Sequence, residues 1–120
     1  MTDPMFDHEK LDVYQVTIDF VALADDIVES LPRGRGYLAD QLNRAATSII
    51  SNLGEGAGEF SPKEKARFYR MSLRSATECA ALLDVCHRLS VIQEDKRQIG
   101  REYLVRIVSM LTKLVKSCNH

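Results

Sequence analysis

The chain has 120 residues, of which 45% are hydrophobic and 28% charged, and its net charge at pH 7 is −1. This composition excludes a disordered chain, and a protein of this length buries roughly two-thirds of its unfolded surface in one core. No apolar run is long enough to cross a membrane, and the acidic N-terminus lacks the pattern of a signal peptide. We therefore expect a cytoplasmic protein with no membrane segment and one domain over residues 1–120.

Four stretches of the sequence show apolar side chains every three or four residues, the spacing of amphipathic helices. The predicted helices span residues 6–31, 37–55, 62–89 and 95–117. Glycine and proline cluster in the first two connections, and Ser61, Pro62 and Glu64 form a capping-box signature at the third start. Long helices joined by short connections predict an all-α fold, an antiparallel up-down-up-down four-helix bundle.

Some apolar residues lie beside the main stripe of their helix. In the first helix these are Ile18, Val21 and Val28, and the last helix carries a complete second stripe. We expect such residues of the first and last helices to bury against neighbouring copies of the chain.

Charge is divided unevenly along the sequence. Residues 1–32 hold eight acidic side chains and one basic side chain, whereas residues 33–120 hold fifteen basic and nine acidic ones. Regions of opposite charge attract each other. Either the first helix screens the others within one subunit, or acidic and basic surfaces meet across a subunit interface.

One face of the second helix carries an ordered row of polar side chains. At offsets of 0, 3, 7, 11 and 14, the row consists of Gln41, Arg44, Ser48, Asn52 and Glu55. Such order indicates a seam that faces another helix, in the same bundle or in a neighbouring subunit. If the second and third helices are antiparallel neighbours, Arg44 and Glu78 lie at similar height. The row then predicts a buried, paired network that fixes helix register, in which Arg44→Ala costs a few kcal/mol.

A basic stripe runs along the third helix. At offsets of 0, 4, 7 and 11 it contains Lys63, Arg67, Arg70 and Arg74, with Lys65 nearby and Arg33 and Arg35 in an earlier loop. A stripe of this kind can follow the phosphates of RNA or DNA. It is also typical of a solvated face, or of partners for the acidic first helix.

The glycine-rich segment at residues 54–60 has neither a preceding strand nor the spacing of a nucleotide-binding loop. We interpret it as a helix end and turn. The alternative is a phosphate site built from exposed backbone N–H groups.

Catalytic and metal-binding patterns are sparse. Asp84 and His87 form one D-x-x-H unit, and nothing in the sequence supplies the second unit that a di-iron bundle requires. Cys79, Cys86 and His87 share part of a helix face, but buried thiols are common core residues, and three cysteines do not suggest a disulfide framework. No base lies beside a nucleophile at a recognisable spacing. We expect no enzyme activity, cofactor or metal; a small-molecule or metal enzyme would have to use the polar row.

The segment from residue 40 to 84 resembles the bacterial four helix bundle protein family, whose members include proteins encoded by intervening sequences of large-subunit ribosomal RNA. The matching residues are Asp40, Gln41, Leu42, Arg44, Ala45, Ser48, Asn52, Glu55 and Gly56, then Ser61, Lys63, Glu64, Arg67 and Phe68, then Ser75, Ala76 and Glu78. The resemblance implies a compact bundle that assembles into a ring, a homopentamer similar to the accessory protein Avd of diversity-generating retroelements. It also implies, by analogy, an association with nucleic acid.

Overall fold

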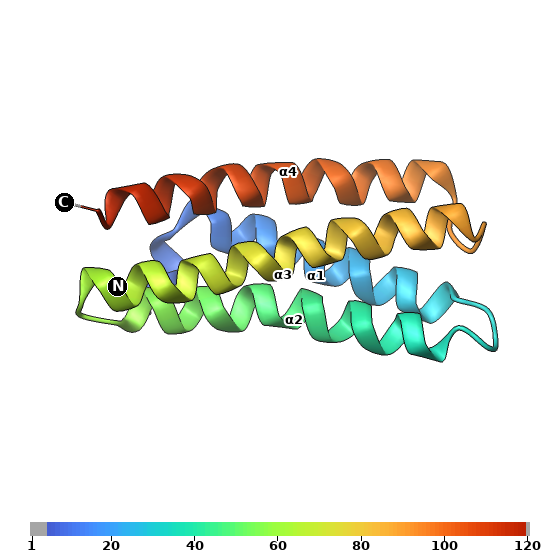
Figure 1. Ribbon diagram of the computed structural model, residues 1–120, viewed down its shortest axis with the longest axis horizontal. Coiled ribbons are helices and arrows are strands. Elements are labelled where there is room, and N and C mark those ends of the chain that lie inside the picture. The colour runs from blue at the N-terminus through green and yellow to red at the C-terminus, as the bar shows by residue number, and fades with distance from the viewer. Residues whose placement is uncertain (1–4, 120) are drawn as a thin grey trace.

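The computed structural model describes residues 5–119, and in this range it contains four α-helices, one short 3-10 helix and no strand. The elements are η1 (Asp7–Lys10), α1 (Asp12–Ser30), α2 (Gly36–Gly58), α3 (Pro62–Arg88) and α4 (Glu94–Ser117). Successive α-helices run in opposite directions along one bundle axis, as predicted (Figure 1). Residues 1–4 of the acidic N-terminus and His120 lie outside the described residues. None of the described helices is both long and apolar enough to span a membrane.

Two helix boundaries differ from the sequence prediction. The first α-helix begins at Asp12 instead of residue 6, because Leu11 has extended backbone angles (φ −90°, ψ 131°) that separate η1 from α1. The second helix continues to Gly58 instead of ending at residue 55. The glycine-rich segment therefore belongs largely to α2.

Each helix packs against its two neighbours in a closed order, α1 on α2, α2 on α3, α3 on α4, and α4 on α1. Helices α1 and α3 lie on the diagonal, which Figure 1 shows as α1 behind α3. All four helices contribute to one core, whose largest fully buried side chains include Phe20, Ile27, Leu42, Ile49, Leu53, Leu83, Leu104, Ile107 and Leu111. The apolar stripes predicted for the helices thus meet at the bundle axis.

The apolar residues beside the main stripes differ in how far they are buried. Val21 and Val28 are partly buried and pack against the core of their own chain. Ile18 of α1 is 38% exposed and Val105 of α4 is 58% exposed. The wide apolar face of α1 is therefore partly buried within the bundle, whereas Ile18 and Val105 remain on the surface.

The start of α3 is capped as predicted, but only in part. The Ser61 hydroxyl accepts a hydrogen bond from the Glu64 backbone N–H at 3.4 Å, and Pro62 occupies the first helical position. The Glu64 carboxylate does not complete the capping box, because it accepts a hydrogen bond from Arg67 Nε at 2.8 Å. One orphan N–H is satisfied, and the acidic group still lies favourably at the helix N-terminus.

Candidate functional site

Small polar side chains join α2 and α3 at the middle of the polar row. Ser75 Oγ donates to Ser48 Oγ at 2.9 Å, and Asn52 Nδ2 donates to the Ser48 carbonyl and hydroxyl at 2.9 and 3.0 Å. One turn away, the fully buried Ser72 hydroxyl donates to the Ile49 carbonyl at 2.7 Å. In the sequence, Ser72 and Ser75 fall on the apolar stripe of α3. This placement is the signal from which the contact could have been predicted. These bonds fix the register of the two helices.

The outer members of the row do not form the predicted buried network. The Ser48–Ser75 bond sets a register that places Arg44 and Glu78 one turn further along, at similar height. Both side chains are nevertheless exposed, and no ion pair joins them among the described residues. Gln41 and Glu55 are exposed as well. Residue spacing gives the face and the height of a side chain, but the long charged side chains stay in water, where they avoid the cost of desolvation.

Exposure of Arg44 changes the expected effect of its removal. We predict that Arg44→Ala lowers the free energy of unfolding by less than about 0.5 kcal/mol, because a surface side chain without an ion pair contributes little. Urea denaturation followed by helical circular dichroism measures this change. The matched substitution Ser75→Ala removes a cross-helix hydrogen bond and should cost about 1 kcal/mol. A larger loss for Arg44→Ala than for Ser75→Ala would contradict the exposed placement.

The basic stripe of α3 lies on the surface, but its members differ in their partners. Lys63, Arg67, Arg70 and Arg74 are all exposed. Arg67 pairs with Glu64 at 2.8 Å, and its guanidinium lies 4.4 Å from the centre of the Phe68 ring. Lys63, Arg70 and Arg74 make no ion pair within residues 5–119. Three exposed cations therefore remain available on one helix face.

The loop arginines do not extend this stripe. Arg33 and Arg35 lie in the α1–α2 connection, at the end of the bundle where α3 terminates. Helix α3 continues for fourteen residues beyond Arg74, about 20 Å along the axis. Arg35 is half-buried and its guanidinium donates to the Tyr37 hydroxyl at 3.1 Å. Arg33 and Arg35 therefore lie on a different part of the surface from the basic stripe of α3.

The glycine-rich segment is a helix end, as interpreted from the sequence, and it does not form the alternative phosphate site. Gly54, Gly56 and Gly58 are helical, so their N–H groups lie within α2, and this end of the helix presents carbonyl groups. Lys65 of α3 donates to the Gly56 and Ala57 carbonyls at 3.3 and 2.8 Å. Its cation suits the negative end of the helix dipole. Lys65 is a helix cap, and it does not contribute to the basic stripe.

The thiols of α3 are core residues. Burial, with a smaller effect of the Glu78 carboxylate, raises the pKa of Cys79 to about 12, and burial also raises the pKa of Cys86. A thiol with so high a pKa is neutral at physiological pH and is a poor nucleophile and metal ligand. His87, the next residue after Cys86, is exposed. The interpretation of Cys79 and Cys86 as core residues is confirmed, and His87 lies at the surface apart from them.

Asp84 and His87 are instead part of a charged corner between α3 and α4. His87 Nε2 lies 2.7 Å from Glu94 Oε2, and Arg97 bonds Glu94 at 2.8 Å and Asp84 at 3.2 Å. The Arg97 hydrogen bond, followed by the charges of Arg97 and His87, lowers the pKa of Glu94. Among residues 5–119, no three His, Cys, Asp or Glu side chains converge as metal ligands would. The corner joins two helices by ion pairs on the surface.

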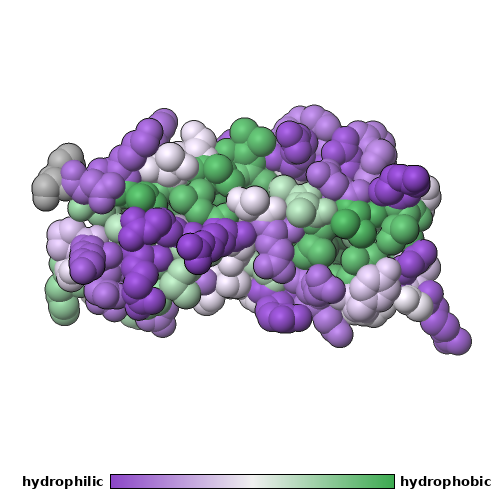
Figure 2. Space-filling model, in the orientation of Figure 1, coloured by the Kyte–Doolittle hydropathy of each residue, from purple (hydrophilic) through white to green (hydrophobic). Residues whose placement is uncertain are grey.

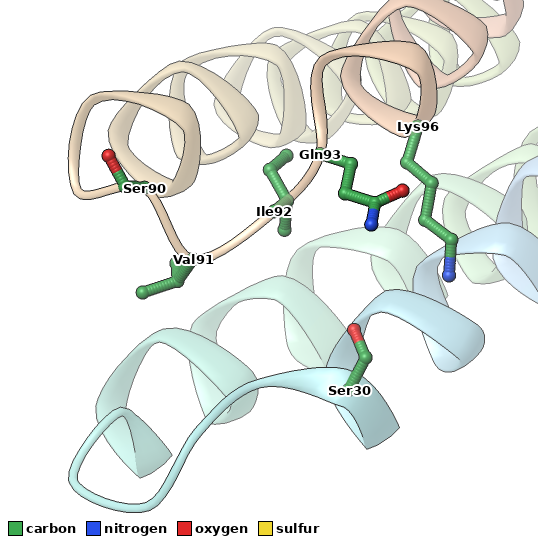
Figure 3. A pocket seen from close by; sticks show the side chains of 6 residues that line it. All are labelled: Ser30, Ser90, Val91, Ile92, Gln93 and Lys96. Carbon is green, nitrogen blue, oxygen red and sulfur yellow. The ribbon is translucent and has the colours of Figure 1, made fainter.

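A cleft of about 300 Å³ lies at the end of the bundle where α3 meets α4 (Figure 3). Figure 3 shows Gln93 and Lys96 of the α4 start pointing toward Ser30 at the end of α1. The Lys96 ammonium pairs with Asp26 at 2.9 Å, and the Ser30 hydroxyl donates to the Ile27 carbonyl at 2.8 Å. The polar groups of the cleft are thus partly engaged with the protein itself, and none is placed as a nucleophile beside a base.

The chain matches a known protein family over most of its length. Residues 9–113 match the model of the family described as 23S rRNA-intervening sequence protein. The chain belongs to this family. The match covers all four α-helices almost entirely and confirms the resemblance found in the sequence.

A solved structure agrees with the fold of this chain. The crystal structure of a protein of unknown function from the S23 ribosomal protein family of Bacteroides thetaiotaomicron superposes with a TM-score of 0.81. The two sequences are 19% identical, and the superposition covers 87% of this chain and 98% of the other. No curated protein matches the sequence. The family match and the superposition establish a family and a fold.

The sequence motif shared with the family serves mainly to pack α2 against α3. Leu42, Ala45 and Ala76 are buried in the core, Ser48 and Ser75 form a cross-helix hydrogen bond, and Asn52 donates to Ser48 within α2. Gly56 is buried against α3. Another part of the motif lies on the surface without an ion pair in the described chain, namely Asp40, Gln41, Arg44, Glu55 and Glu78.

Proposed function

We propose that the protein is a non-enzymatic scaffold that associates with further copies of itself. The observation that carries this proposal is apolar surface between α3 and α4. A groove of about 410 Å³ lies there, lined in part by Leu104, Val105 and Val108. Figure 2 shows hydrophobic side chains gathered along this face and edged by hydrophilic ones. Contiguous exposed apolar surface is typical of a site that another macromolecule covers.

The resemblance to ring-forming bundle proteins suggests five copies. Two features of the chain support a structural role over catalysis. The buried Cys79 thiol has its pKa raised to about 12, and the exposed His87 is paired with Glu94. The Cys79 thiol lacks the exposure and the pKa that nucleophilic catalysis requires, and the His87 imidazole is held in a surface ion pair between two helices.

Light scattering on a sizing column tests the scaffold proposal directly. We expect a mass equal to several chains of 13.5 kDa, with five as the expected number, at micromolar concentration. The measured mass should fall on dilution if the association is reversible. A one-chain mass over the whole accessible concentration range would reject the proposal.

A second candidate function is binding of RNA or DNA. The observation that favours it is the three exposed cations Lys63, Arg70 and Arg74, which lack an ion pair within the described chain. Such a face would bind phosphates with an affinity that falls steeply as salt increases. The near-neutral net charge of −1 gives no general attraction, so any binding would depend on this stripe.

Fluorescence anisotropy with labelled single-stranded RNA and duplex DNA at low salt tests this second candidate. We expect that reversing Arg70 and Arg74 to glutamate would abolish binding, whereas reversing Lys116, an exposed cation outside the stripe, would have little effect. If the wild-type protein does not bind either probe at low salt, the nucleic-acid candidate is rejected.

A further inference from the structure

The outward face of α1 has the spacing of a contact helix but is not covered by any other part of the described chain. Its residues lie at offsets of 0, 3, 7, 10 and 14, and all are exposed: Gln15, Ile18, Ala22, Asp25 and Glu29. Ile18, which is 38% exposed, and the small Ala22 form an apolar centre on this face. A helix face of this kind can pack into a groove between two other helices.

The face is also strongly acidic. Helix α1 carries five acidic side chains and no basic one. Asp26 pairs with Lys96 at 2.9 Å, and Asp19 accepts a hydrogen bond from Gln15. Asp25 and Glu29 have no cationic partner among the described residues. Only one ion pair among the described residues, Asp26 with Lys96, therefore supports the alternative that α1 screens the basic helices within one subunit.

A groove with complementary properties lies on the other side of the molecule. Between α3 and α4, the small Ala76 and Ala80 of one helix and Leu104, Val105 and Val108 of the other line an open volume of about 410 Å³. The most exposed of these side chains is Val105, at 58%. Because alanines form one wall, the backbone of a third helix can approach closely.

The surroundings of this groove are basic. Helices α3 and α4 together hold twelve basic and six acidic side chains. Arg101 lines the groove, Arg74 lies one turn from its lining residue Thr77, and both are exposed. Neither arginine makes an ion pair within residues 5–119.

We infer that the outward face of α1 of one copy docks into the α3–α4 groove of the next copy. The inference rests on the proposed self-association and names the two surfaces that carry it. Ile18 and Ala22 would cover Val105 and its neighbours, while Asp25 and Glu29 would face the arginines of the groove. The groove gains an apolar cover, and the acidic helix gains counter-charges.

The contact is head-to-tail. Two α1 faces repel each other, because each presents Asp25 and Glu29 and neither carries a basic side chain. Within one chain α1 lies behind α3, so the face and the groove point in different directions (Figure 1). Each copy can therefore use its groove for one neighbour and its α1 for another, and such contacts close into a ring or continue as a filament.

A pair of identical substitutions tests the groove. Val105→Arg places a bulky cation at the centre of the inferred contact, and Val85→Arg makes the same change at a position on α3 that is 42% exposed and does not line the groove. We expect Val105→Arg to raise the midpoint concentration of association about thirtyfold or more. Val85→Arg should keep the wild-type mass. Circular dichroism must show wild-type helicity for both variants, which their exposed positions favour.

Charge exchange tests the partner. Reversing Asp25 and Glu29 to lysine should weaken association, and so should reversing Arg74 and Arg101 to glutamate. A chain that carries all four reversals should associate again, because the complementary signs are restored. The control reverses Asp40 and Glu55 to lysine, since both are exposed acids on α2, and it should keep the wild-type mass.

The outcomes separate this inference from the proposed function. A wild-type mass of one chain rejects self-association itself. A wild-type oligomer that survives Val105→Arg and both reversals shows that the chain associates through another surface and overturns the inference alone. Dissociation by the Asp40 and Glu55 control, and not by the α1 reversal, would place the contact on the exposed surface of α2. If reversal of Arg74 and Arg101 abolishes RNA binding and leaves the mass unchanged, the basic surface serves nucleic acid instead.

Discussion

Phe20→Ala is expected to lower the free energy of unfolding by about 3–5 kcal/mol. Phe20 of α1 is fully buried, and its ring reaches toward the surface of α4 near Gly100. Its removal loses the transfer energy of an aromatic ring and leaves a cavity that the neighbouring helices cannot fill completely. A domain of this kind is stable by only about 5–15 kcal/mol, so the variant should be close to unfolding at physiological temperature.

Urea denaturation at one fixed protein concentration measures the effect of Phe20→Ala, because association would otherwise shift the midpoint. The matched control is Phe60→Ala. Phe60 lies in the α2–α3 connection and is 99% exposed, so its removal should change the free energy by less than about 0.5 kcal/mol. Equal losses for the two phenylalanines would contradict the packing of α1 onto the bundle.

The sequence predicted the fold well because helix periodicity and core packing are the same physical constraint. Val13, Val16, Phe20 and Ile27 share a face of α1 in the sequence pattern, and all four are buried. The prediction failed where local rules compete with tertiary contacts. The glycine-rich segment was expected to end α2 near residue 55, but the helix continues to Gly58, where Lys65 satisfies its last carbonyls.

The candidate site was predicted less well, because spacing does not determine where a long side chain goes. The central serines of the polar row are short, and their positions on the helices force them into contact, as Ser48 and Ser75 show at 2.9 Å. Arg44 and Glu78 are at matching heights, but their flexible side chains remain in solvent. Whether another subunit covers them depends on surfaces that no single-chain pattern specifies.

Helices α2 and α3 approach each other closely at Gly56. A Cβ atom placed on Gly56 would lie 2.8 and 2.9 Å from two ring carbons of Tyr69 and 3.1 Å from Phe68 Cβ. The Tyr69 ring cannot move away easily, because the side chain is only 4% exposed and packs in the core. Two residues earlier on the same helix, a Cβ on Gly54 would meet no atom within 4 Å.

The two glycines are therefore expected to respond to alanine with opposite signs. Gly54→Ala should raise the free energy of unfolding by about 0.5–1 kcal/mol, because alanine favours the helix and restricts the unfolded chain. Gly56→Ala gains the same helix preference but must displace a packed aromatic ring, and overpacking of this kind costs about 1–3 kcal/mol. We expect net destabilisation at Gly56. Denaturation curves with equal slopes for both variants allow their midpoints to be compared directly.

The contrast between these variants isolates close packing from helix propensity. Both replacements add the same methyl group to the same helix, two residues apart, so any difference comes from what the methyl group meets. Stabilisation by both alanines would show that α3 can retreat from α2 without cost, and that the Ser72 and Ser75 bonds do not hold the helices at this distance. Combining Gly56→Ala with Tyr69→Leu tests whether the ring is the obstacle. If it is, Gly56→Ala should lower the free energy of unfolding by less in a chain that already carries Tyr69→Leu than in the wild type.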